Sequence, residues 1–202
     1  EDLLVQQTTA DYLTNNLGWE SVYAYNDEIL GVDGTLGRRS EKEIILTRYL
    51  NQALRKLNPD LPDEAYESGI RQITEVSSAQ TLLATNQEKY DLLKNGVKVR
   101  YRNEKNKEKQ TVLKIFDFTH PENNHFLCVR ELWVKGDIYR KRPDIMGFVN
   151  GIPLLFIECK NMHRDLEVAY RRNFADYKDT VPHIFHYNAV IMLANGDKAK
   201  IG

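Results

Sequence analysis

The spacing of apolar residues along the chain changes near residue 95. Before that point, apolar residues recur every three or four positions, which is typical of helices. Four stretches have this spacing: residues 3–17, about 40–57, 62–76 and 79–94. From Val97 onward, apolar residues alternate with polar ones, and this period of two predicts a half-buried strand.

The last three helical stretches predict a helical insert over about residues 40–94. Ser40 is followed three residues later by Glu43, which is a capping-box sequence and predicts that the first of these helices starts there. Asn58-Pro59-Asp60 interrupts the pattern, and Asn95-Gly96 ends it. The insert is acidic, which is typical of a scaffold or a partner surface rather than of a catalytic site.

Strands are predicted on both sides of an apolar hairpin in the second half of the chain. Outside that hairpin they cover residues 19–25, 97–102, 111–118, 125–134 and 189–193. Asp165 is the predicted N-cap of a helix over about 165–179. This order of elements predicts an α/β fold in which a sheet, antiparallel in its first strands, is flanked by helices.

The hairpin carries ionisable groups at its open end. Asn150-Gly151 joins its two apolar strands and is a strong turn signal. Asp144 opens the first strand, and Glu158 and Lys160 end the second, two residues apart and therefore on one face. Such groups are rarely buried without a partner or a function, so we predict a site here.

Strand register decides whether this site can form. With a strict two-residue turn at Asn150-Gly151, the numbers of paired residues sum to 301, and Asp144 then faces away from Glu158. A sum of 302 places the two carboxylates opposite each other. A three-residue loop that includes Ile152 gives this register, and Pro153, which cannot donate a ladder hydrogen bond, fits beside it. We therefore predict a bulged or longer turn.

These residue types suit metal-dependent hydrolysis of a phosphodiester. Mg²⁺ prefers hard oxygen ligands, so Asp144 and Glu158 are the predicted ligands, with the backbone carbonyl of Cys159 as a third. Lys160 would orient the attacking water and offset phosphate charge. Hairpin charges without a function remain the alternative, because an acid-x-Lys triplet alone is a weak signal.

Charge is distributed unevenly, although the formal net charge is only −1. Residues 1–93 have 8 basic and 16 acidic side chains, whereas residues 94–142 have 13 basic and 6 acidic ones. A basic segment of this kind is typical of a surface that meets a polyanion, and a solvated basic hairpin explains it equally well. The candidate DNA-binding residues are Lys98, Arg100, Arg102, Lys141, Arg142, Arg171 and Arg172.

Cysteine usage and hydropathy indicate the cellular compartment in which we expect the protein. Cys128 and Cys159 lie in apolar strand-like stretches without metal-ligand spacing, which predicts reduced core thiols. There is no signal peptide and no run of about 18 apolar residues. We expect a soluble, cytoplasmic protein without a membrane partner. His183 and His186 have H-x-x-H spacing, but Pro182 argues against a helical metal pair.

Three segments resemble the PD-(D/E)xK motif of a known nuclease family: Arg142-Pro143-Asp144-Ile145, Val149-Asn150-Gly151-Ile152-Pro153-Leu154 and Ile157-Glu158-Cys159-Lys160-Asn161. The version resembled is the N-terminal endonuclease domain of the restriction (R, motor) subunit of type I restriction–modification enzymes. Leu17-Gly18-Trp19, Asn58-Pro59, Asn95-Gly96-Val97 and Phe116-Asp117-Phe118 are also similar, so the resemblance covers most of the chain. It implies a restriction-endonuclease-like fold and Mg²⁺-dependent cleavage of double-stranded DNA.

The resemblance also implies roles and partners. Asp144 and Glu158 would be metal ligands, and Lys160 the catalytic lysine. Residues 1–202 would form a single nuclease domain, a fragment of a longer chain that continues into an ATP-dependent motor. ATP would bind only to that motor, and the partners would be methyltransferase and specificity subunits. The alternatives are a nuclease-like module that only binds DNA or subunits, and a stand-alone repair nuclease.

The chain departs from the family pattern at two places. The family often has Gln-x-x-x-Tyr in the helix after the motif, whereas this chain has Asn173 and Tyr177. These two share a helix face and could look into the site, although core packing explains Tyr177 equally well. Related nucleases often place an acid in the first helix near the metal, where this chain has Gln6 as a possible supporting residue.

Overall fold

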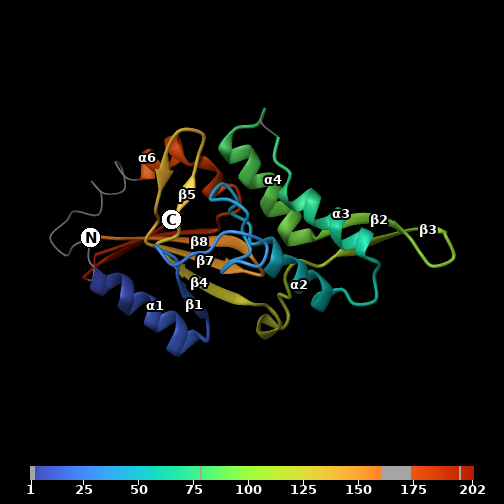
Figure 1. Cartoon of the computed structure of the whole chain (residues 1–202), viewed down its shortest axis with the longest axis horizontal. Coiled ribbons are helices and arrows are strands. Elements are labelled where there is room, and N and C mark those ends of the chain that lie inside the picture. Colours follow the sequence, from blue (N-terminus) through green and yellow to red (C-terminus); the bar gives the residue numbers. More distant parts are fainter. Residues whose placement is uncertain (1–2, 78, 161–173, 196) are drawn as a thin grey trace.

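A mixed six-stranded sheet forms the centre of the computed structural model, which describes residues 3–77, 79–160, 174–195 and 197–202 (Figure 1). The strand order is β1-β4-β7-β8-β9-β10, and the pairs β1/β4 and β8/β9 are parallel. The expected α/β class is thereby confirmed, but the expectation that the first strands pair antiparallel is wrong for β1, which runs parallel to β4. The strands are β1 Glu20–Tyr23, β4 Phe126–Arg130, β7 Ile145–Val149, β8 Ile152–Cys159, β9 Val190–Ala194 and β10 Ala199–Ile201.

Helices cover both faces of this sheet (Figure 1). The helix predicted over residues 3–17 is α1, Leu3–Leu17, and Gly18 follows it with a left-handed φ of 71°. The other described helices are α2 Thr47–Leu57, α3 Asp63–Thr74, α4 Leu82–Asn95 and α6 Ala175–Thr180, with short 3₁₀ helices η1 Pro121–Asn123 and η3 Pro182–Phe185. No described helix has the length and apolar character needed to cross a membrane.

The predicted start of the first insert helix is wrong. Residues 40–46 are not helical, and α2 begins at Thr47 without a side-chain cap. The Glu43 carboxylate accepts a hydrogen bond from the Arg39 N–H (3.0 Å) instead of closing a capping box. Leu46 donates its N–H to the Gly151 carbonyl (2.9 Å), so contact with the hairpin turn holds this segment in place of a helical turn.

Two further strand pairs lie outside the main sheet. β2 Val97–Arg102 pairs with β3 Glu108–Leu113, and β5 Val134–Lys135 pairs with β6 Arg140–Lys141. β3 therefore starts earlier than the predicted strand at 111–118, because Arg102 pairs with Glu108 across a short loop. Ile115 and Phe116 are buried without belonging to a strand.

The core is divided by the sheet into two apolar clusters. The larger one packs the sheet against the insert and includes Leu50, Leu54, Phe148 and Phe156. The smaller one packs α1 against the other face and comprises Ala10, Leu13, Cys128, Ile145, Ile157 and Cys159. Both thiols are thus buried, as predicted, and burial raises the pKa of Cys128 to about 11, which keeps that thiol protonated.

Candidate active site

Asp144 and Glu158 face each other at the open end of the β7–β8 hairpin. The pairs Ile145↔Ile157 and Met146↔Phe156 sum to 302, and the same register continued by one position sets Asp144 opposite Glu158. The predicted register is confirmed. Both carboxylate side chains are buried, with only 3% exposure for each residue.

The predicted three-residue loop is wrong. The turn contains only Asn150 and Gly151, whose φ values of 51° and 80° fit the type I′ turn that Asn-Gly favours. Next to the turn, Phe148↔Pro153 and Val149↔Ile152 still sum to 301. The register shifts between Gly147 and Phe148, which leaves Leu154 as the extra residue of a bulge within β8. The bulge, not the turn, brings the carboxylates to one face.

Backbone groups on neighbouring strands hold Asp144 in place. Its Oδ2 accepts a hydrogen bond from the Cys159 N–H at 2.6 Å, and its own carbonyl accepts one from the Glu131 N–H at 2.9 Å. Because the N–H and C=O of one strand residue point to the same side, the Cys159 carbonyl faces the side of the Asp144 carboxylate. This orientation suits its predicted role as a third oxygen ligand.

Glu158 and Lys160 form a buried ion pair. Lys160 Nζ donates to Glu158 Oε1 at 2.6 Å, and the two residues share a face as predicted. Lys160 is 9% exposed and lies at the end of β8. Its N–H is anchored to the Ala194 carbonyl of β9 at 2.7 Å. The lysine therefore balances the charge of the buried carboxylate at the end of the strand.

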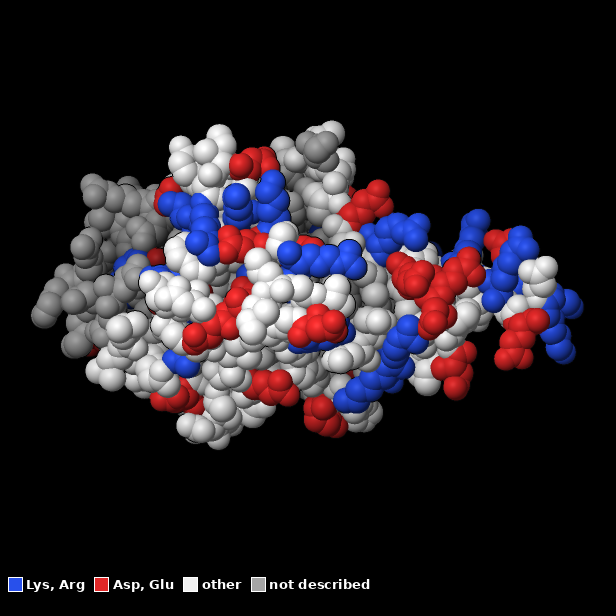
Figure 2. Space-filling view, in the orientation of Figure 1, with Lys and Arg blue, Asp and Glu red and all other residues white. Residues whose placement is uncertain are grey.

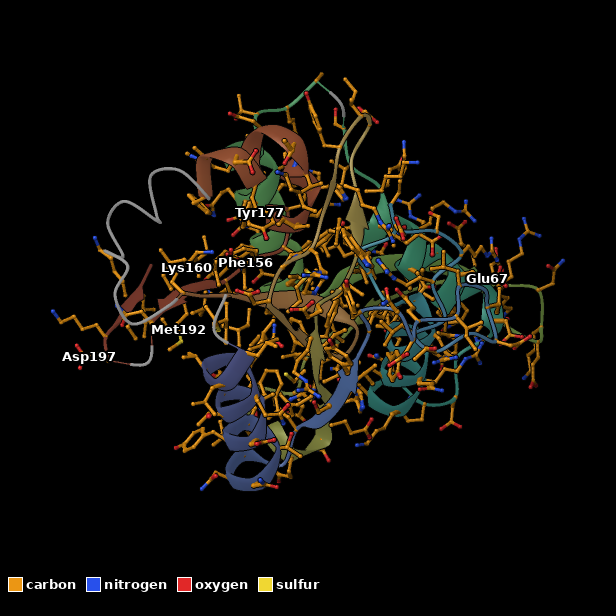
Figure 3. All side chains as sticks on the ribbon, turned by 60° about the vertical axis from the view of Figure 1, so that its left-hand side comes forward. Glu67, Phe156, Lys160, Tyr177, Met192 and Asp197 are labelled. Carbon is orange, nitrogen blue, oxygen red and sulfur yellow. The ribbon has the colours of Figure 1, made fainter. Side chains whose placement is uncertain are left out.

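Tyr177 of α6 both packs in the core and reaches the site. The sequence had left core packing and a role at the site as alternatives, and both describe this residue. Its hydroxyl lies 3.3 Å from Glu158 Oε2 and 3.2 Å from the Arg142 carbonyl. Its ring contacts Phe156 edge to face, with centroids 5.1 Å apart (Figure 3). The hydroxyl has one proton, so it donates to one of these acceptors at a time.

Gln6 reaches the site through Glu131, a residue that sequence reasoning missed. Gln6 Nε2 donates to Glu131 Oε1 and Arg142 Nε approaches Glu131 Oε2, both at 2.9 Å. Glu131 is buried, directly follows β4 and has a left-handed φ of 56°. Its N–H also holds the Asp144 carbonyl. The only sequence signal was an acid at the end of an apolar strand.

The oxygen donors of this site fit a Mg²⁺ ion. The described residues contain no group of three or more His, Cys, Asp and Glu side chains arranged to hold a metal. Mg²⁺ keeps several waters, however, and binds through one or two carboxylates, which Asp144 and Glu158 provide on one face. His183 and His186 lie elsewhere, on and just after η3.

The candidate DNA-binding cations do not gather around this site. Lys141 is paired with Asp176 (2.5 Å) and Arg142 with Glu131. Lys98, Arg100 and Arg102 are exposed on β2, on the side of the molecule away from β8 and Lys160 (Figures 1 and 3). Arg171, Arg172 and Asn173 lie outside the described residues, as does the predicted N-cap Asp165.

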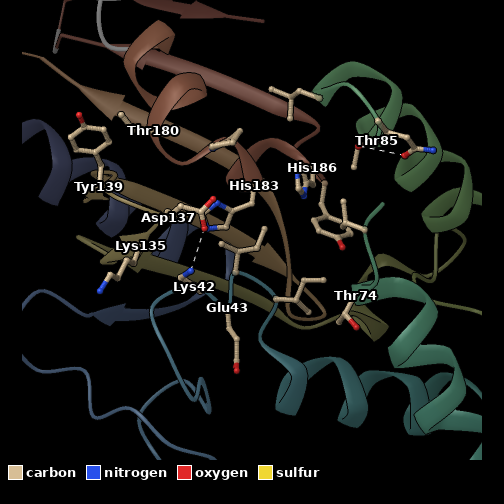
Figure 4. Close-up of a pocket in the computed structure, with 18 of the residues that line it drawn as sticks. Lys42, Glu43, Thr74, Thr85, Lys135, Asp137, Tyr139, Thr180, His183 and His186 are labelled. Atoms are coloured by element: carbon tan, nitrogen blue, oxygen red, sulfur yellow. Dashed lines mark hydrogen bonds and ion pairs between the residues drawn. The ribbon is translucent and has the colours of Figure 1, made fainter. Parts of the chain in front are cut away.

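A separate cavity of about 1040 Å³ lies between the insert and the β5–β6 hairpin (Figure 4). Asp144, Glu158 and Lys160 do not line it. An ion pair between Lys42 and Asp137 (3.3 Å) closes part of its wall, and His183 and His186 are among its lining residues. The cavity therefore does not take part in the geometry of the carboxylate site.

Sequence comparison assigns the chain to a protein family. A family profile described as "Type I restriction enzyme R protein N terminus" matches residues 1–202. The chain belongs to this family. It is 36% identical over 202 residues to the type I restriction enzyme HindI endonuclease subunit of Haemophilus influenzae, covering 98% of this chain and 19% of that subunit.

A more distant relative agrees with this family assignment. A Methanocaldococcus jannaschii protein, whose name proposes it as the MjaIXP endonuclease subunit of a type I restriction enzyme, is 26% identical over 208 residues. That match covers 100% of this chain and 19% of the relative. The chain thus spans about a fifth of the length of these relatives, in the region that the family description calls the N terminus of the R protein.

Proposed function

We propose that this chain is a Mg²⁺-dependent endonuclease module that cleaves double-stranded DNA as part of a type I restriction enzyme. The observation that carries the proposal is the β8 bulge, which sets Asp144 opposite Glu158, with Lys160 Nζ 2.6 Å from the Glu158 carboxylate. Family membership supports the assignment. The restriction-endonuclease-like character of the fold belongs to the same proposal.

Hydrolysis joins a water oxygen to phosphorus, breaks a phosphorus–oxygen ester bond and moves a proton to the leaving oxygen. A Mg²⁺ ion, when bound, supplies positive charge at the phosphoryl oxygens and lowers the pKa of a water. Asp144 and Glu158 would hold the ion, together with the Cys159 carbonyl. Lys160, paired with Glu158 before DNA arrives, would place its ammonium group against the scissile phosphate.

Surrounding residues keep these groups in position. The Cys159 N–H orients Asp144, and the Tyr177 hydroxyl approaches the Glu158 oxygen opposite the one that Lys160 contacts. The Glu131–Arg142 ion pair fixes the segment that precedes Asp144. Such outer contacts orient ligands and typically contribute about 10- to 100-fold in metal affinity or activity.

The relatives' lengths support a wider organisation. Because this chain spans 19% of each relative described above, we propose that residues 1–202 form one nuclease domain of a longer chain that continues into an ATP-dependent motor. Methyltransferase and specificity subunits would then select the DNA site, and this module would supply only the cut. ATP would bind to the motor and not to this module.

Cleavage by the assembled enzyme tests the proposal. Asp144→Asn, Glu158→Gln and Lys160→Met, each introduced into the longer chain, should abolish cleavage of plasmid DNA in Mg²⁺ and ATP. DNA translocation, followed by displacement of a triplex-forming oligonucleotide, should persist. Asp117→Asn is the matched control, because it alters a buried carboxylate that bonds the Thr119 and His120 N–H groups away from the site.

Unchanged cleavage in all three site variants would overturn the proposal and favour a nuclease-like module that only binds DNA or partner subunits. A stand-alone repair nuclease would instead be indicated if the natural chain lacks a motor and cuts DNA without ATP.

A further inference from the structure

The β2–β3 hairpin forms an arm that extends from the body of the molecule (Figure 1). Its strands pair continuously from Val97↔Leu113 to Arg102↔Glu108. One face packs on α3, where Val99 and Leu113 are buried and a Cβ on Gly69 would lie 2.4 Å from Leu113 Cδ1. One face of the arm therefore packs against α3, and its other face is open to solvent.

The open face of the arm carries cations at every second position. Lys98, Arg100 and Arg102 are exposed and face Val112, Gln110 and Glu108 across the ladder. Residues 94–114 contain 8 basic and 2 acidic side chains. In Figure 2, basic side chains follow the arm, with acidic ones among them.

These cations differ from those near the carboxylate site. Lys141 and Arg142 are paired with Asp176 and Glu131, whereas Lys98, Arg100 and Arg102 form no ion pair with any described residue. Removing an unpaired surface cation costs little stability, so stability does not account for three of them in one row. Their charge is available to a polyanion.

The shape of the arm suits a groove of double-stranded DNA. The major groove is about 12 Å wide and admits a two-stranded β-ribbon. Gln110 lies opposite Arg100 on β3 and offers an amide, a group that also hydrogen-bonds phosphate oxygens.

An acidic protein fits the open face less well. Stable protein interfaces have an apolar or aromatic centre. On the open face of the two strands, Val112, at 47% exposure, is the single apolar side chain.

We propose that the β2–β3 arm enters the major groove of double-stranded DNA, with Lys98, Arg100 and Arg102 on its phosphates, at a surface separate from the catalytic hairpin. This inference deepens the proposed function and depends on it for the identity of the DNA. The arm would hold a stretch of duplex at a distance from the phosphate that is cut, and would add affinity without sequence selection.

Binding without cleavage tests the arm. The chain is titrated into a short fluorescein-labelled duplex in EDTA, and anisotropy gives the affinity at several salt concentrations. The triple variant Lys98→Ala, Arg100→Ala, Arg102→Ala should weaken binding by about tenfold or more at low salt, and should reduce the slope of log affinity against log salt by about 2 to 3. Its circular dichroism melt should match that of the unaltered chain.

The matched control removes three exposed lysines elsewhere, with Lys42→Ala, Lys135→Ala and Lys178→Ala. It should lower the affinity less than threefold by the general loss of charge. Equal losses in both triple variants, or none in the arm variant, would overturn the proposal. The second result would direct the search to an acidic protein partner.

Groove ligands test the mode of binding. Methyl green, which occupies the major groove, should compete with the chain, and netropsin, which occupies the minor groove, should not. Competition by netropsin alone would overturn the major-groove assignment. Because EDTA removes the metal, this titration measures DNA binding without cleavage. Loss of arm binding is therefore distinguishable from loss of cleavage, which the plasmid assay measures separately.

Discussion

At the scale of single residues, the hydroxyl of Tyr177 is the contact that links α6 to Glu158. Tyr177→Phe keeps the ring contact with Phe156 and removes the approach to the carboxylate and to the Arg142 carbonyl. We expect the Mg²⁺ concentration for half-maximal cleavage to rise by about tenfold, because an outer contact that orients the ligand is lost. Cleavage rates across a Mg²⁺ titration measure this.

Tyr187→Phe is the matched control for this substitution. The Tyr187 hydroxyl donates to the Ile73 carbonyl at 2.7 Å, away from the carboxylates. Both variants should lose about 1 kcal/mol of unfolding free energy, but only Tyr177→Phe should change the Mg²⁺ requirement. A similar Mg²⁺ response in the two variants would show that Tyr177 acts only through packing.

Gln6 offers a test of what α1 contributes. Its amide donates to the buried Glu131, so Gln6→Glu would place two carboxylates in contact. We expect the free energy of unfolding to fall by about 2 kcal/mol at neutral pH. This loss shrinks as the pH falls and one carboxylate takes up a proton. Urea unfolding at several pH values measures this. If Gln6 were instead a metal ligand, the variant would bind Mg²⁺ more tightly.

At the scale of elements, the hairpin turn depends on the glycine of Asn150-Gly151. Gly151 has a φ of 80°, and an added Cβ would lie 2.5 Å from the Leu46 carbonyl oxygen. Gly151→Ala should therefore cost more than about 2 kcal/mol of unfolding free energy, from strain and from the backbone clash.

The control for Gly151→Ala is Gly18→Ala. Gly18 has a similar φ of 71°, but an added Cβ there meets nothing within 4 Å. Gly18→Ala should lower the free energy of unfolding only by the conformational strain, about 1 kcal/mol. Equal losses in the two variants, measured by urea unfolding, would contradict the close contact between the turn and the start of α2.

The 3₁₀ helix η3 should make the fold sensitive to acid through His183. Burial lowers its pKa from the ordinary value of 6.5 to about 4, and its Nε2 has no hydrogen-bond partner among the described residues. Between these pH values the unfolded chain binds more protons than the folded one. The free energy of unfolding should therefore fall as the pH drops from 6.5 toward 4, by up to about 3 kcal/mol.

His183→Gln should flatten this part of the stability profile, because it removes the proton uptake in the unfolded chain. Replacing the exposed His120 by Gln should leave the profile as steep as before. Thermal melts at a series of pH values measure both. An unchanged slope in His183→Gln would assign the acid sensitivity to other groups.

At the scale of the whole molecule, metal binding should stabilise the fold. An ion that binds only the folded chain adds about 1.4 kcal/mol when its concentration is ten times its dissociation constant. We expect Mg²⁺ to raise the melting temperature of the chain and EDTA to reverse this. Asp144→Asn should lose the response, whereas Asp117→Asn should melt at a lower temperature and keep it.

Much of the architecture could be predicted because it follows from local periodicity. The bounds of α1 and of the strand at 97–102, and the presence of three insert helices, came from apolar spacing. Gly18 and Gly96 follow their helices as expected. The start of α2 and the extent of β3 could not be predicted in this way. Both depend on long-range backbone pairing, of Leu46 with Gly151 and of Arg102 with Glu108.

The sequence by itself placed the two carboxylates and the lysine of the candidate site on the two strands of one hairpin. Asp144, Glu158 and Lys160 are close in sequence, and a period of two is enough to relate them. Only the tertiary structure decided how the register is achieved. Bulging of Leu154 depends on how β8 packs between two neighbouring strands, and no local rule locates such an insertion.

The tertiary structure alone also brought Gln6, Glu131 and Arg142 together behind Asp144, although Gln6 and Glu131 are 125 positions apart. Contacts at such separation form because buried polar groups must find partners wherever the fold places them. The tertiary structure also separated the cations that the sequence had grouped. Lys141 and Arg142 form ion pairs beside the site, whereas the cations of β2 form no ion pair within the described chain.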